Sequence, residues 1–231
     1  MKKLSHYYRQ FIYRRQVNLL PECAGGYGRG GQDIYVADLL GRPANGTFVD
    51  IGANDGVTIS NTLYFEKELG WSGLAIEPMP DAYTRLKTNR RCHTLNACIA
   101  DREGRAEFLE ITGRAAMLSG LVDKYDQQHL RRIDRTIKRL GGSRKITQVE
   151  CLRFHTAMAR YNINRIDFLS LDTEGGELDI LKEIDFKVLP VRAISVENNY
   201  FTFAIRDYLS QFGFRHMGTI GIDEIYLKSE P

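Results

Sequence analysis

A short apolar run that ends in a glycine-rich turn is the feature that most constrains the fold of this chain. Residues 47–51 read Thr-Phe-Val-Asp-Ile, and Gly-Ala-Asn-Asp-Gly follows directly over residues 52–56. An apolar run of this length is typical of a buried parallel strand, and glycine permits a sharp turn from that strand into a helix. The segment therefore predicts a strand-turn-helix unit of an α/β domain, with its helix reaching about Gly70.

Further segments continue this alternation along the chain. Apolar runs predict strands at residues 73–77, 94–100, 106–111, 149–152, 167–172 and 191–197. Helical patterns occupy residues 80–89, 121–140, 153–161 and 177–183, and a closing hairpin is expected within residues 208–227. Strands that alternate with helices imply a mostly parallel sheet with helices on both faces. Between two of the strands, residues 113–147 are expected to form a helical cap or substrate insert.

Acidic residues stand at the ends of four predicted strands, namely Asp50, Glu77, Asp172 and Glu197. Ligands of open α/β sheets bind outside the carboxyl ends of the strands, so these side chains are expected to face one crevice. The alternative is that each of them only caps a turn or a helix.

The glycine turn differs from the G-x-G-x-x-G pattern that holds a dinucleotide, and the acidic Asp50 and Asp55 would repel a pyrophosphate there. S-adenosylmethionine is a better candidate for this turn, because it carries no phosphate and its ammonium group favours nearby carboxylates. Glu77 is predicted to accept hydrogen bonds from the two ribose hydroxyls. Asp101 follows the third strand and is predicted to meet the adenine amino group, although a plain β-turn explains it equally well.

The chain resembles the FkbM family of methyltransferases. The resemblance rests on residues 48–58 (FVDIGANDGVT) with Ser-Asn-Thr at 60–62, on residues 65–73 (FEKELGWSG), on Ile-Glu-Pro at 76–78, on residues 166–177 (IDFLSLDTEGGE) and on residues 194–199 (ISVENN). Gln32-Asp33 also looks like an early element of that family. In total the resemblance covers roughly residues 30 to 227, and the combination of blocks is far more specific than a glycine turn alone.

The resemblance implies a Rossmann-like class I methyltransferase fold with a mostly parallel seven-stranded sheet. It also implies methyl transfer from S-adenosylmethionine, usually to an oxygen of a sugar, a glycan or a natural product. The residues expected to bind this cofactor are Asp33, Asp50, Gly52, Asn54, Gly56, Asn61, Glu77, Pro78 and Asp101.

Removal of a hydroxyl proton calls for a general base. Asp172, Glu174, Glu197 and His155 are the candidates, the first three near strand ends and His155 on a predicted helix. Alternatively, Asp172, Glu197 and Asn198 could hold Mg²⁺ or Mn²⁺, which prefer oxygen ligands and acidify a bound hydroxyl. Acids in the loop before residues 177–183 could also simply cap that helix.

Residues 1–24 form a basic and aromatic leader that is expected to be helical, and residues 25–231 form the methyltransferase domain. The glycine-rich segment Gly25–Gly31 predicts a flexible hinge between them. Residues 1–20 could lie on an anionic membrane, dock on a partner, or pack on the domain as an ordinary surface helix.

Charge and cysteine content limit the setting of the protein. A formal net charge of +3 gives no strong support to nucleic-acid binding. Four cysteines without paired spacing, and no apolar stretch of membrane-spanning length, indicate a reduced cytoplasmic protein, with a peripheral position at the inner membrane face as an option.

The expected function is O-methylation of a sugar or glycan hydroxyl. Alternatives are a degenerate cofactor-binding module, or a methyltransferase for a natural product or nucleic acid.

Overall fold

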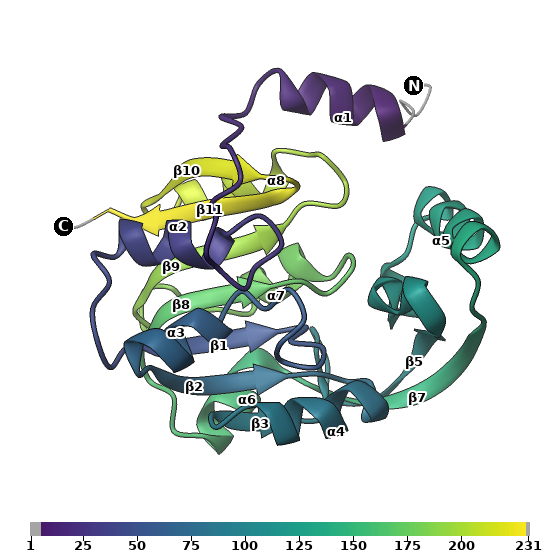
Figure 1. The fold of residues 1–231 in the computed structure, drawn as a ribbon, viewed down its shortest axis with the longest axis horizontal. Helices are drawn as coiled ribbons and strands as arrows, with labels where there is room; N and C mark the ends of the chain where they lie inside the picture. The colour runs from purple at the N-terminus through teal and green to yellow at the C-terminus, as the bar shows by residue number, and fades with distance from the viewer. Residues whose placement is uncertain (1–5, 230–231) are drawn as a thin grey trace.

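The computed structural model describes residues 6–229, and its centre is a seven-stranded sheet (Figure 1). The strands lie in the order β3-β2-β1-β8-β9-β11-β10. Their bounds are β1 Thr47–Ile51, β2 Ser72–Ile76, β3 His93–Leu95, β8 Ile166–Leu171, β9 Val191–Glu197, β10 Phe214–Ile220 and β11 Asp223–Lys228. Strands β3, β2, β1, β8 and β9 pair in parallel, while β11 is antiparallel to both β9 and β10. The predicted mostly parallel seven-stranded sheet is confirmed.

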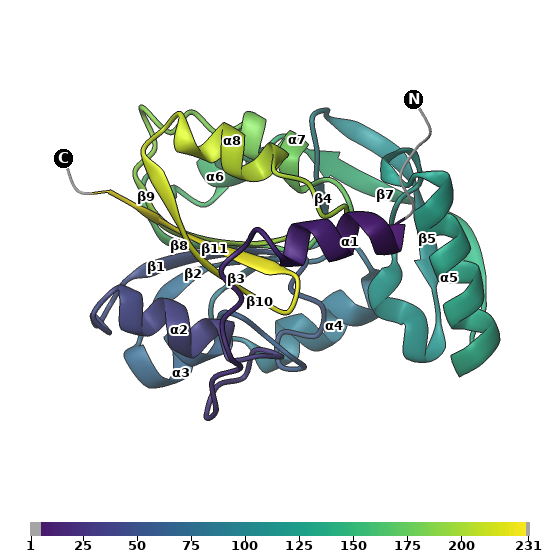
Figure 2. The ribbon, with the colours of Figure 1, turned by 90° about the horizontal axis from the view of Figure 1, so that it is seen from above.

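Helices cover both faces of this sheet because side chains alternate along buried strands and both faces are apolar. Figure 2 shows α2, α3 and α4 on one face and α6, α7 and α8 on the other. Phe48 and Phe168 pack toward α2 and α3, whereas their neighbours Val49 and Leu169 pack in the core on the opposite face. The helices are α2 Gln32–Leu39, α3 Leu63–Leu69, α4 Pro80–Asn89, α6 Phe154–Arg160, α7 Glu177–Lys182 and α8 Ala204–Ser210.

Trp71 anchors the start of β2 by packing in the core. Its indole ring is buried against Phe65 with ring centroids 4.6 Å apart, and Nε1 donates a hydrogen bond of 2.6 Å to the carbonyl of Pro43.

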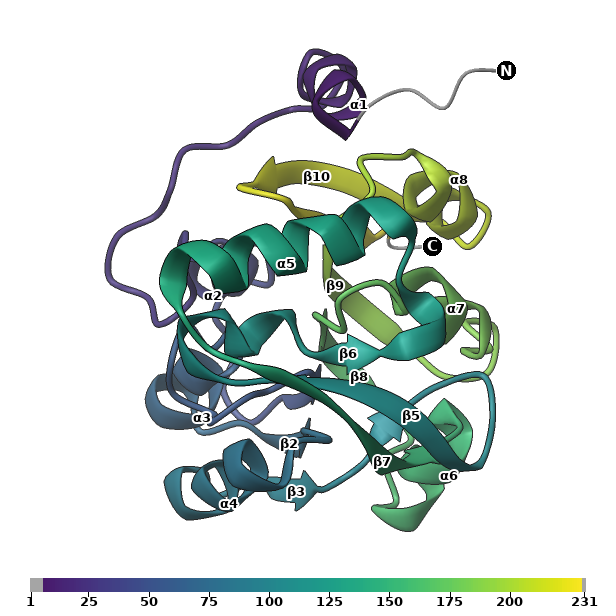
Figure 3. The same ribbon diagram turned by 90° about the vertical axis from the view of Figure 1, so that its right-hand side faces the viewer.

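A second, four-stranded sheet lies beyond the carboxyl ends of the central strands (Figures 1 and 3). Its order is β4-β7-β5-β6, with β4 Cys98–Ile99, β5 Gly104–Ile111, β6 Gly120–Leu121 and β7 Arg144–Leu152. The prediction of one strand over residues 94–100 was therefore wrong. Asn96 separates β3 from β4, and its amide donates to the carbonyls of Glu77 and Pro78, so the chain leaves the central sheet at this residue.

The predicted helical insert contains strands as well as a helix. Helix α5 spans Gln127–Leu140, and the expected helix start at Leu121 was wrong because residues 113–124 form β6 and the 3₁₀ turns η1 Gly113–Leu118 and η2 Val122–Lys124. Ile133 and the partly buried Ile137 face a small core with Ile111 and Leu118, which fixes α5 against the second sheet. Together η1, α5 and the antiparallel pair of β5 and β7 form a cap over the central sheet.

The leader packs on the domain through one buried side chain. Helix α1 spans His6–Arg14, and the ring of Tyr13 is only 2% exposed between Phe201 and Phe203, with its hydroxyl donating to Glu224. Phe11 on the same helix is 56% exposed. Lys2 and Lys3 of the predicted basic leader lie outside the described residues. Within residues 6–229, no helix is long and apolar enough to cross a membrane.

The glycine-rich segment is a packed loop where the sequence predicted a flexible hinge. The amide of Tyr27 donates a 2.7 Å hydrogen bond to the buried Asp33, and a Cβ atom on Gly26 would lie 2.2 Å from the same carboxylate. Glycine is required here because the loop backbone wraps tightly around Asp33 at the start of α2.

Candidate functional site

Two cavities open at the carboxyl ends of the central strands, and the first lies between the glycine turn and the cap. Its volume is about 340 Å³, in the range of small-molecule sites. Gly52, Asn54, Glu77 and Pro78 line one side, and the other side is formed by mostly apolar residues of the second sheet and cap, including Cys98, Ile99, Phe108, Ile111 and Leu121. A polar edge opposite an apolar wall suits a ligand with hydroxyl groups and a flat ring system.

Glu77 is the principal acid of this first cavity. It follows β2, and its two carboxylate oxygens accept hydrogen bonds of 2.9 Å from the backbone amides of Asn54 and Met79. Each oxygen keeps a further lone pair for a ligand. Burial raises the pKa of Glu77 to about 7 despite these two donors. The glycine turn and the acid that follows the next strand are therefore joined directly, which the sequence could only suggest.

Gly52 has a structural task as well as a place in the cavity wall. Its φ angle is +90°, and a Cβ atom would lie 1.8 Å from the carbonyl oxygen of Asp172. The close approach of the two strand ends requires glycine at this position. The same contact places Asp172 beside the glycine turn.

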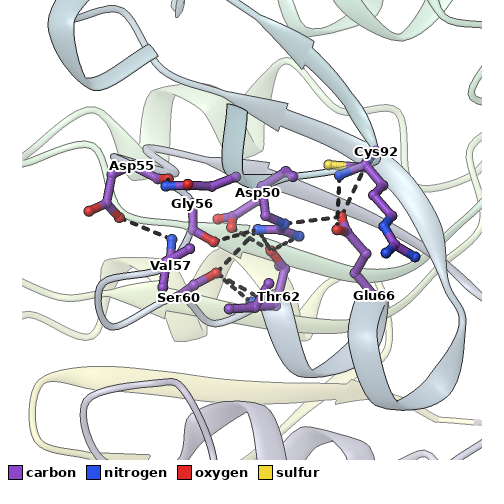
Figure 4. A network of polar contacts seen from close by, with 12 residues as sticks. Asp50, Asp55, Gly56, Val57, Ser60, Thr62, Glu66 and Cys92 are labelled. Carbon is purple, nitrogen blue, oxygen red and sulfur yellow. Dashed lines mark hydrogen bonds and ion pairs between the residues drawn. The ribbon is translucent and has the colours of Figure 1, made fainter. Parts of the chain in front are cut away.

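Asp50 supports the glycine turn from the α3 face of the sheet and does not line either cavity. It points to the α3 face, where it accepts a 2.6 Å hydrogen bond from the hydroxyl of Thr62 (Figure 4). Arg90 crosses the same space, pairs with Glu66 at 3.0 Å and donates to the carbonyl of Gly56. Burial raises the pKa of Asp50, and the nearby Arg90 counteracts this shift. This buried network holds the backbone of the glycine turn.

The remaining residues predicted to bind a cofactor lie in different surroundings. Asn61 lines the second cavity, and its amide donates to Ser170 at 3.3 Å. Asp101 forms ion pairs with Arg102 and Lys124 outside the lining of either cavity. Gly56 and Asp33 are also outside both linings. Cofactor contacts for these residues stay predictions.

The second cavity is larger, about 480 Å³, and more polar than the first. Its lining includes Gln32, Asn61, Glu197 and Asp223 from the central domain, and it extends to η1, α5 and α1. Asp172, Glu174 and Met117 line both cavities. The two cavities therefore meet at the loop that follows β8.

Three carboxylates cluster at this junction. One oxygen atom from each of Asp172, Glu174 and Glu197 lies within 4.8 Å of the others. The amide of Asn199 donates to Glu197 and, at 3.3 Å, to Glu174. Burial, reinforced by the neighbouring acids, raises the pKa values of Asp172 and Glu197 well above their usual range. The cluster can accept protons at a higher pH than ordinary carboxylates do, or hold a divalent cation.

The loop between β8 and α7 is shaped to present these acids. Glu174 adopts a left-handed φ of +58°, and Gly175 follows at +126°. The buried Glu177 caps the loop by accepting hydrogen bonds from the amides of Thr173 and Gly175, at 3.0 and 2.9 Å. The capping role that the sequence allowed for acids in this region thus belongs to Glu177, which leaves Glu174 directed at the cavities.

Two of the residues proposed for chemistry lie away from the cluster. His155 is exposed on α6, outside the lining of either cavity. The amide of Asn198 donates to the carbonyl of Thr202 at 2.7 Å, so its side chain closes a local turn.

Sequence reasoning missed His129 on the cap helix. Its ring is buried, stacks on Tyr125 at 4.8 Å, and brings Nε2 to 3.3 Å from Glu174 Oε2, at an angle that makes no hydrogen bond. The spacing of Tyr125, His129 and Ile133 at every fourth residue was the signal that this histidine shares the inward face of α5.

Comparison with known proteins identifies the family. The model of the Methyltransferase FkbM domain matches residues 50–216. Among curated proteins, the chain is 27% identical over 169 residues to Methyltransferase sdnD of Sordaria araneosa, covering 64% of each chain. It is 26% identical over 157 residues to Methyltransferase 1 of Beauveria bassiana (strain ARSEF 2860), covering 64% of this chain and 62% of the relative. The chain thus spans under two thirds of the length of these relatives.

Among solved structures, the methyltransferase FkbM from Methylobacillus flagellatus KT aligns with a TM-score of 0.46 and 13% identity, over 79% of this chain and 43% of that one. The family match covers most of the chain and includes the glycine turn, Glu77 and the acid cluster. This chain therefore belongs to the FkbM family of methyltransferases.

Proposed function

We propose that this chain is an S-adenosylmethionine-dependent methyltransferase that acts on a hydroxyl group of a sugar or glycan. The observation that carries the proposal is the meeting of two cavities at Asp172 and Glu174. The first cavity, with Glu77 and its apolar wall, suits the ribose and adenine of the cofactor. The second cavity, with amide and carboxylate groups, suits an acceptor rich in hydroxyls.

S-adenosylmethionine supplies, when bound, a reactive methyl group on a positively charged sulfur. The chain has to orient the acceptor, exclude water and remove one proton. Asp172 lines both cavities and has a raised pKa, so we assign it as the general base that takes the proton of the acceptor hydroxyl. Burial is the main cause of that raised pKa, the charge of Glu174 adds to it, and a hydrogen bond with Glu197 partly offsets it. Asn199 holds Glu174 and Glu197 in place.

The same three carboxylates favour a second form of the mechanism, in which they bind Mg²⁺ or Mn²⁺. The ligand set would then be Asp172, Glu174 and Glu197, since the side chain of Asn198 is engaged with Thr202. A cation held there would acidify the acceptor hydroxyl, and a chelator would then abolish transfer while cofactor binding persists.

We also propose that the protein is cytoplasmic, because its four cysteines are predicted to be reduced. A membrane contact through residues 1–20 stays a prediction. Natural products and nucleic acids stay alternative acceptors, and a non-catalytic module stays the alternative from another class.

Calorimetric titration with S-adenosylmethionine, S-adenosylhomocysteine and NAD tests the proposal. We expect the first two to bind with dissociation constants in the micromolar range and NAD not to bind. Glu77→Gln should weaken binding by roughly tenfold or more, whereas the exposed Glu107→Gln serves as the matched control. Asp172→Asn should leave cofactor binding unchanged. In a mixture of monosaccharides, this variant should form S-adenosylhomocysteine about 10²-fold or more slowly than the wild-type chain. A folded protein that binds neither cofactor form would identify a degenerate module instead.

A further inference from the structure

Five arginines from separate parts of the chain converge on the second cavity. Arg14 comes from α1, Arg29 from the glycine-rich loop, Arg114 from η1, and Arg132 and Arg139 from α5. These segments are more than 100 residues apart at their extremes. Arginine offers a planar set of donors that matches phosphate oxygens in a bidentate manner. A cavity wall with guanidinium groups from four segments is therefore suited to an anion.

These five guanidinium groups are not neutralised by direct contacts. Within residues 6–229, none of them forms an ion pair with a carboxylate, whereas Arg90, Arg102, Arg144 and Arg165 all do. Arg132 instead donates a 2.9 Å hydrogen bond to the side-chain oxygen of Asn199, which stands between it and the acid cluster. Apart from this bond and a 3.9 Å contact of Arg29 with the sulfur of Met117, no hydrogen bond within the described residues occupies the guanidinium donors, which are thus available to a ligand.

Helix α5 divides its charges between two stripes. Arg132, Thr136 and Arg139 recur at the helical spacing of four and three residues and line the cavity. Arg131 and Arg135 lie on another side of the helix, are exposed, and are absent from the lining. Only this second stripe is a solvated helix face.

Charge in the second cavity is divided between its floor and its wall. Glu174, Glu197 and Asp223 are acids of the floor and are buried or half-buried. Arg14, Arg29, Arg114 and Arg139 are exposed, and Glu22 is the exposed acid among them. An acceptor that placed a hydroxyl at the acidic floor would direct the rest of its structure along the basic wall.

We propose that the methyl acceptor carries a phosphate group, which Arg114 and Arg139, with Arg14, Arg29 and Arg132, bind at the wall of the second cavity. This inference rests on the proposed methyltransferase function and narrows its acceptor to a phosphorylated hydroxyl compound, such as a sugar phosphate or a lipid-linked sugar phosphate. The hydroxyl lies at Asp172, and the phosphate remains unchanged in the reaction.

Calorimetry on the full chain without cofactor tests the anion site directly. The probes are inorganic pyrophosphate, glucose 1-phosphate and glucose. We expect both phosphates to bind, and glucose to bind at least roughly tenfold more weakly. The double variant Arg114→Ala/Arg139→Ala should weaken both phosphates at least roughly tenfold, whereas Arg131→Ala/Arg135→Ala should leave them unchanged. Sedimentation with phosphatidylcholine vesicles, with and without a polyprenyl phosphate, distinguishes a lipid-linked source from a soluble one.

Failure of both phosphates to bind, equal binding of glucose and its phosphate, or an equal loss in the control pair would overturn the inference. Titration of each variant with S-adenosylmethionine separates this result from the proposed function. Retained cofactor binding with lost phosphate binding supports the inference and excludes misfolding. If the wild-type chain binds phosphate but no cofactor, the anion site holds and the methyltransferase proposal fails.

Discussion

His129 Nε2 lies 3.3 Å from Glu174 Oε2, and this approach joins the cap helix to the acid cluster. The two residues belong to elements that are distant in sequence, and both are buried. His129 also packs between Tyr125 and Tyr200, with ring centroids 4.8 and 6.4 Å away. The position of α5, and with it part of the wall of the second cavity, thus depends on packing against the loop between β8 and α7.

Replacement of His129 by alanine should lower the free energy of unfolding by about 2 kcal/mol, because it leaves a hole between two tyrosine rings. Urea denaturation measures the effect. The exposed Gln127→Ala on the same helix is the control and should leave the midpoint unchanged. Equal stability of the two variants would show that the cap is held by its apolar core alone.

Loss of Glu66 should destabilise the protein strongly. The side chain of Arg90 is fully buried and pairs with Glu66 at 3.0 Å. Glu66→Ala therefore leaves the buried positive charge of Arg90 without this partner, and Asp50 is then the nearby acid that remains. We expect a cost of about 3–5 kcal/mol in urea denaturation. Asp38→Ala, which removes the exposed ion pair with Arg42, should have little effect. A small change in the Glu66 variant would contradict the structural role of this network.

Binding of S-adenosylmethionine should depend on pH through Glu77. Burial raises the pKa of this carboxyl to about 7, and its ionised form is the better acceptor for ribose hydroxyls. The affinity should therefore rise with pH through about 7, and fall by up to roughly tenfold for each pH unit below it. Calorimetry at pH 6, 7 and 8 measures this. In the Glu77→Gln variant the dependence should disappear, and a persistent slope would assign it to another group.

Stability of the cofactor-free protein should decrease as pH rises from about 5 to 8. Burial raises the pKa of Asp223 to about 6 and that of Glu77 to about 7, above their ordinary values. Acids whose folded pKa is raised contribute stability below their unfolded pKa and lose it as pH rises through the folded pKa. Thermal unfolding across this range should show the decline, and Asp223→Asn should reduce its slope. An increase in stability with pH would refute this account.

Local patterns in the sequence were sufficient to predict the central sheet and the acids at its edge. Each signal lies within a few consecutive residues. These signals are the apolar run at 47–51, the glycines after it, and the acids at or next to the ends of β2, β8 and β9. Because parallel strands end at one edge, those patterns also predicted that Glu77, Asp172 and Glu197 share a crevice. The closing hairpin of β10 and β11 was also predicted, because apolar alternation and turn residues are local signals.

Tertiary structure decided which side chains reach that crevice. Asp50 is the next-to-last residue of a correctly predicted strand, yet it points to the α3 face and the network of Arg90, because neighbouring side chains on a strand face opposite sides. The second sheet was missed because β5 pairs with β7 across more than thirty residues, and no local pattern encodes such a pairing. His129 reaches the acid cluster, and Arg114, Arg132 and Arg139 reach the second cavity, only once that pairing places the cap over the sheet.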